Sequence, residues 1–147
     1  MGYALFANRK LVLDSQLNSL QLQQQQRSNE QYQLATDNLS LQQQMSALST
    51  AEANELKTLY EDLASANDEN ARAQIQAQIQ AKQADFKSEE EAINNQIYLI
   101  SQKENAIEME VKHLDTEVTA VQKQLEAVEQ AEGAGIDRAT PKYNGIG

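Results

Sequence analysis

The stretch from Ile93 to Val128, INNQIYLISQKENAIEMEVKHLDTEVTAVQKQLEAV, carries an apolar residue at every seventh position. The series begins one heptad earlier and reads Phe86, Ile93, Ile100, Ile107, Leu114, Val121 and Val128. A first series with the same spacing reads Phe6, Leu13, Leu20, Arg27, Leu34, Leu41 and Leu48, with Arg27 as its one polar member. Apolar residues repeated every seven positions are typical of helices that pack along one another in a coiled coil.

The two series mirror each other about Asn67, because their members lie at matching distances on either side of it. The sequence therefore predicts an all-α fold, a long antiparallel two-helix coiled-coil hairpin that reverses at Asn67. This register predicts three contacts: Leu20 with Leu114, Leu34 with Ile100, and Leu48 with Phe86. A single continuous helix that dimerises in parallel is the alternative. It is disfavoured because Leu48 and Phe86 are 38 positions apart, which is not a whole number of heptads.

Helix signals set the expected bounds of this hairpin, which we assign to residues 1–135. Arm one is expected over about 3–65 and arm two over about 68–132. Asn67 is a candidate N-cap for arm two, and Asp68 is placed to pair with Arg72 four residues on. Glycines at 133 and 135 predict the end of arm two, and residues 136–147, which include Pro141, are predicted to form an irregular C-terminal tail.

Residues 46–52 interrupt the regular spacing of arm one. Leu48 is followed by Leu56, eight positions later instead of seven, and the segment from Ser49 to Glu52 has the pattern of a capping box. A break in the helix would use that cap. We expect a kink or a phase shift instead, because the apolar series resumes within one turn.

Composition and charge restrict the functions that the chain can have. There are 21 glutamines, one proline and no cysteine, and the net charge is −10. The excess acid lies in residues 51–132, whereas residues 1–50 carry three basic and three acidic side chains. We expect no nucleic-acid partner and no membrane insertion, because an acidic helical pair repels anionic surfaces and no apolar run approaches the roughly 20 residues of a membrane span. A cytoplasmic location is the default, and export without a cleavable signal is the alternative.

Large apolar side chains also occur away from the heptad positions, where the hairpin would not bury them. A line of such residues predicts an interface with another molecule. The candidates away from the heptad positions are Leu11, Leu22, Tyr32, Leu39, Tyr98 and Leu99, and the candidates near the two ends of the chain are Phe6 and Tyr143. The ends of the chain could form a docking surface or a clasp that closes the hairpin.

Arg27 and Glu104 are the candidate register-setting residues, because each occupies a heptad position normally filled by an apolar side chain. The alternative for Arg27 is a packed aliphatic stem with a solvated guanidinium. Glu110 and His113 match one Glu-x-x-His motif of di-iron helix bundles. Such a site needs two of these motifs and the chain has one histidine, so we expect no metal, no cofactor and no enzyme.

The function expected from these patterns is structural. The chain is predicted to be a self-assembling coiled-coil protein, a helical-hairpin subunit of a homo-oligomer or filament. The alternative is a protein-binding module, such as a secretion chaperone or tether that receives another protein's helix.

Overall fold

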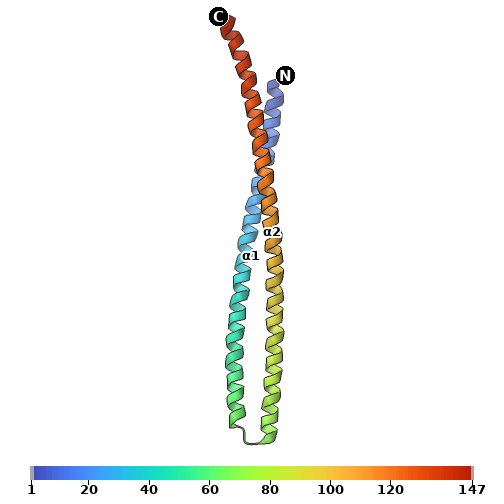
Figure 1. The fold of residues 1–147 in the computed structure, drawn as a ribbon, viewed down its shortest axis with the longest axis vertical. Coiled ribbons are helices and arrows are strands. Elements are labelled where there is room, and N and C mark those ends of the chain that lie inside the picture. The colour runs from blue at the N-terminus through green and yellow to red at the C-terminus, as the bar shows by residue number, and fades with distance from the viewer. Residues whose placement is uncertain (1, 147) are drawn as a thin grey trace. The chain divides into compact units, whose positions relative to one another are not determined.

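The fold is a helical hairpin, seen in a computed structural model that describes the backbone of residues 2–146 and the side chains of residues 3–133. Helix α1 spans Gly2–Ser65 and helix α2 spans Glu69–Ile146. Three residues link the helices, and the chain reverses direction between them (Figure 1). The predicted all-α hairpin is confirmed, and the single continuous helix is wrong.

The reversal lies at Ala66–Asp68, centred on Asn67 as the mirrored series predicts. Asp68, and not Asn67, is the N-cap of α2. Its carboxylate accepts a 3.3 Å hydrogen bond from the backbone N–H of Asn70, and its carbonyl accepts a 3.0 Å bond from the N–H of Arg72. Both bonds are those expected of an N-cap residue. Asp68 and Arg72 thus meet through the backbone, in place of the side-chain pair that was predicted.

Helix α1 continues without a break through residues 46–52. The Thr50 hydroxyl donates a 3.1 Å hydrogen bond to the carbonyl of Ser46, a local bond that a helix accommodates, and no new helix begins at Ser49. The predicted phase shift is visible in the burial pattern. The half-buried residues Leu48, Glu52 and Leu56 follow one another in two consecutive steps of four, where a regular heptad alternates three and four.

The hairpin divides into two compact units, each containing a part of both helices. Unit 1 comprises residues 1–31 and 106–147, and unit 2 comprises residues 32–105. Among the described side chains, unit 1 buries seven apolar residues: Leu13, Ile107, Leu114, Val118, Val121, Leu125 and Val128. Unit 2 buries three: Leu41, Ile79 and Phe86. Unit 2 therefore has the thinner core.

Polar residues at the seam explain why the core is thin. In unit 2, Asn38 takes a half-buried seam position of α1 and Glu104 takes one of α2, so neither helix offers a continuous apolar stripe there. In unit 1, Leu13 packs with Val121, Leu125 and Val128 into one cluster, against which Phe6, Leu17 and Leu20 are partly buried. Burial of a full aliphatic side chain contributes about 1.5–3 kcal/mol, so unit 1 gains more from its seam than unit 2 does.

Contacts across the seam differ in register from the mirror-image prediction. Four polar pairs cross between the helices: Lys10–Glu129, Gln24–Asp115 and Arg27–Glu110 in unit 1, and Glu55–Lys82 in unit 2. Each α2 partner lies three to five residues further along the chain than the mirrored position. Leu20 shares a groove with Val121, seven residues beyond its mirrored partner Leu114, and Leu34 and Ile100 both line a second groove.

The direction of helical side chains explains this displacement. Each side chain leans toward the N-terminus of its own helix, so side chains on antiparallel helices lean in opposite directions. If two Cα atoms lie at the same height along the hairpin axis, their side chains lean away from each other. Side chains that meet therefore come from residues that lie further toward the C-terminus of each helix. The mirror-image prediction paired residues by position along the axis and left out this tilt.

Helix α2 keeps a helical backbone to Ile146, past the glycines where the sequence predicts its end. A C-terminal glycine cap requires a positive φ, and no glycine of the described backbone has one. The side chains of residues 134–147 lie outside the described residues, so a separate role for 136–147 stays a prediction. Neither helix contains, over the described residues, an apolar segment long enough to cross a membrane.

Candidate interaction surfaces

Large apolar side chains are exposed on both units, as the predicted interface requires. Six of the eight predicted interface residues are exposed: Leu11, Leu22, Tyr32, Leu39, Tyr98 and Leu99. Phe6 differs, because it is half-buried and packs against the cluster around Leu13. Its heptad position places it in the seam, so it is not a free surface residue. The side chain of Tyr143 lies outside the described residues.

Large apolar side chains are also exposed at Tyr3, Leu5, Val12, Tyr60 and Met109. Tyr3 lies seven residues before the half-buried Lys10, so its spacing alone predicts a seam residue. Its exposure reflects its place in the first turn of α1. Tyr60 directly follows the half-buried Leu59 and lies four heptads after Tyr32, so a strict heptad count already places it on the exposed side.

One side of unit 2 gathers three of these residues. Tyr32 and Leu39 are 76% and 56% exposed and lie seven residues apart on α1, each directly after a half-buried seam residue. Tyr98 is 61% exposed and directly follows the half-buried Ile97 on α2. Because the three share one heptad position, and equivalent positions of two antiparallel helices flank the seam on one side, they belong to a common face.

A groove marks the opposite flank of the seam in unit 2. Its lining combines apolar and polar side chains: Leu34, Asp37, Ser40, Leu41 and Gln44 from α1, with Gln96, Leu99, Ile100 and Lys103 from α2. Leu99 is thus separated from its neighbour Tyr98, since one lies at the groove and the other on the face with Tyr32 and Leu39. The predicted interface residues of unit 2 therefore belong to two surfaces.

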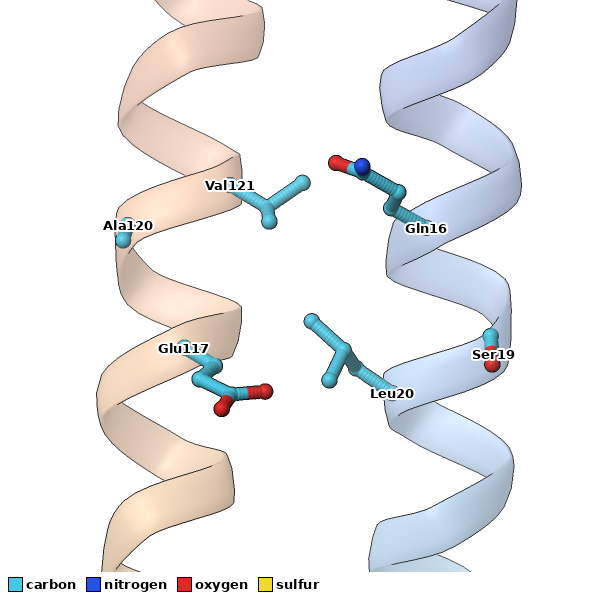
Figure 2. Close-up of a pocket in the computed structure, with 6 residues that line it drawn as sticks. All are labelled: Gln16, Ser19, Leu20, Glu117, Ala120 and Val121. Carbon is cyan, nitrogen blue, oxygen red and sulfur yellow. The ribbon is translucent and has the colours of Figure 1, made fainter.

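Unit 1 carries a smaller groove between its helices. It is lined by Gln16, Ser19 and Leu20 of α1 and by Glu117, Ala120 and Val121 of α2. Figure 2 shows Leu20 and Val121 pointing toward each other across it, with the side chains of Gln16 and Glu117 beside them.

The candidate register residues have different surroundings. The guanidinium of Arg27 lies 2.9 Å from the Glu110 carboxylate across the seam and 2.6 Å from Glu30 on its own helix, with 30% of the side chain exposed. Arg27 therefore forms a cross-helix ion pair while its stem is partly buried. Glu104 is half-buried, and it takes part in no ion pair among the described residues.

The Glu-x-x-His residues are engaged separately. Glu110 pairs with Arg27, whereas the exposed imidazole of His113 lies 2.6 Å from Glu117 one turn further along α2. The two side chains of the motif thus have different partners. Within the described residues, no three His, Asp or Glu side chains cluster in a way that could hold a metal ion.

Comparison of the chain with protein-family models, with curated proteins and with solved structures finds no match. The functional argument therefore depends on the surface and the core of the hairpin itself.

Proposed function

We propose that the protein is a structural subunit that assembles with copies of itself, and that its function is not catalytic. The main support for the proposal is that unit 2 buries few apolar residues and exposes many. This unit buries three apolar residues and exposes five large ones: Tyr32, Leu39, Tyr60, Tyr98 and Leu99. Removing that exposed surface from water would stabilise an assembly by about 25 cal/mol for each Å² buried.

Two further features support a structural role. The charge of −10 keeps the chain soluble while apolar residues stay accessible for association. Acid–base catalysis commonly uses side chains whose pKa values are tuned by burial and by neighbouring groups. Among the described residues no polar or charged side chain is buried.

The test is the mass of the assembled protein, measured by light scattering and inspected by negative-stain electron microscopy. The variant Tyr32→Ser, Leu39→Ser, Tyr98→Ser should lose assembly while its helicity by circular dichroism persists. The matched control Tyr32→Phe, Leu39→Met, Tyr98→Phe keeps an apolar side chain at every position and should assemble normally. Equal assembly of the two variants would contradict the proposal.

A second candidate function is a module that receives the helix of another protein. The groove of unit 2 favours it, because Leu34, Leu99 and Ile100 offer apolar contacts there and Asp37 and Lys103 offer polar ones. A helix laid in such a groove uses apolar anchors at intervals of three and four residues. A protein that remains a monomer at every concentration would favour this function over self-assembly.

A further inference from the structure

The exposed residues of α1 in unit 2 have an unusual property for so acidic a chain. All fourteen exposed residues between Tyr32 and Ala51 are uncharged. We call them the uncharged face: Tyr32, Gln33, Ala35, Thr36, Leu39, Ser40, Gln42, Gln43, Gln44, Ser46, Ala47, Ser49, Thr50 and Ala51. The single charged residue in this stretch is Asp37, which is half-buried and lines the groove with Lys103.

The neighbouring part of α2 in the same unit, in contrast, exposes charged residues. Between Lys87 and Asn105 it exposes five charged residues: Lys87, Glu89, Glu90, Glu91 and Lys103. The two helices of unit 2 therefore present different surfaces, one without charge and one with mixed but mainly acidic charge. A solvated helix needs no such asymmetry, because charged residues are good helix formers and would serve equally well on α1.

We infer that the uncharged face of α1 is the surface on which a second copy of this chain docks, through the same face of that copy. The inference rests on the proposed self-assembly and names the surface that produces it. A second copy also carries −10 charges, so most approaches bring like charges together. Contact between two uncharged faces is the approach within unit 2 that avoids this repulsion.

The chemistry of the face is complementary to itself. Each glutamine side chain offers two N–H donors and a carbonyl acceptor, and each hydroxyl can donate and accept, so two identical faces can satisfy each other's hydrogen bonds. Leu39 and Tyr32 supply the apolar part. Use of the same patch by both partners is the arrangement of a two-fold symmetric dimer, the commonest closed assembly of identical chains.

The test places two negative charges at different positions of the same unit. Variant A is Gln43→Glu with Ser46→Asp, both on the uncharged face. Variant B is Ser88→Asp with Asn95→Asp, both exposed on α2. The two variants have equal net charge, so a general effect of charge acts on both alike. Association measured by sedimentation should weaken at least about tenfold in variant A and change little in variant B.

Cysteine labelling locates the contact independently, because the chain has no cysteine of its own. Gln43→Cys should react slowly with a maleimide in concentrated protein and rapidly in dilute protein, whereas Asn95→Cys should react equally in both. If the protein assembles but variant B is the weaker, or Asn95→Cys is the protected site, the inference is wrong and self-assembly stands. If the unmodified protein never assembles, the proposed function fails and this inference fails with it.

Discussion

The Nε atom of Arg27 lies 2.9 Å from a carboxylate oxygen of Glu110, and this ion pair joins the two helices of unit 1 across the seam. The mirror-image prediction pairs Arg27 with Ile107, three residues earlier. Gln24–Asp115 at 2.7 Å and Lys10–Glu129 at 3.6 Å are displaced in the same direction. The three polar contacts thus agree on the direction of the displacement, which is three or five residues, although each contributes little stability alone.

This register can be tested by cross-linking within one chain. A protein with Lys10→Cys and Glu129→Cys should form an intramolecular cross-link readily with a short bis-maleimide, because these side chains meet across the seam. The comparison protein carries Lys10→Cys and Gln124→Cys, the pair that mirror symmetry predicts. Faster cross-linking of the second protein would show that the displaced register is wrong.

We expect the hairpin to be less stable with arginine at position 27 than with an apolar residue there, even though Arg27 forms ion pairs. Arg27→Leu should raise the free energy of unfolding by about 1 kcal/mol, because a buried leucine contributes about 1.5–3 kcal/mol and exposed ion pairs contribute about 0–1. Urea titration followed by circular dichroism measures the change. Arg27→Gln removes the pairs without adding apolar surface and should be less stable than the unmodified protein. A destabilised Arg27→Leu would indicate that the ion pairs outweigh apolar packing at this position.

Leu39 and Leu41 are near neighbours on α1 with opposite environments, 56% and 8% exposed respectively. Leu41→Ala should lower the free energy of unfolding of dilute protein by about 2 kcal/mol or more, since it leaves a cavity in the seam of unit 2. Leu39→Ala should change it by less than about 0.5 kcal/mol. Assembly of concentrated protein should be weakened by Leu39→Ala and changed little by Leu41→Ala. If Leu39→Ala destabilises the dilute hairpin as strongly, Leu39 belongs to the core and not to an interface.

Salt distinguishes apolar assembly from assembly by opposite charges. Chains with a net charge of −10 repel each other, and added salt screens that repulsion over a Debye length of about 8–10 Å. Association through the uncharged face should therefore strengthen as sodium chloride is raised, as measured by light scattering. If the assembled protein dissociates at high salt, ion pairs between subunits would hold it together instead.

The sequence was sufficient to predict the hairpin because its information is periodic. The heptads, the mirror symmetry about Asn67 and the cap residues beside it each predict the same reversal. The register between the two helices was harder to predict, because it depends on the direction in which side chains tilt. Counting residues from Asn67 does not include this tilt, and so it does not predict that Arg27 reaches Glu110. Gly133 keeps a helical backbone, because glycine permits a positive φ without imposing one.

The exposure of the candidate interface residues could be predicted in part. Exposed apolar residues such as Tyr32 and Tyr98 follow from their heptad positions, and the neutrality of the first fifty residues is plain from the sequence. The sequence also shows that Asp37 is the single charged residue between Tyr32 and Ala51, whereas its half-buried place in the groove with Lys103 required the structure.

The central claim is that this hairpin assembles with copies of itself, and sedimentation velocity of the unmodified protein over a wide range of concentration tests it most directly. The account predicts that the weight-average mass rises with concentration above the 16.4 kDa of one chain. A helical protein that sediments as a single 16.4 kDa species at every concentration would contradict it.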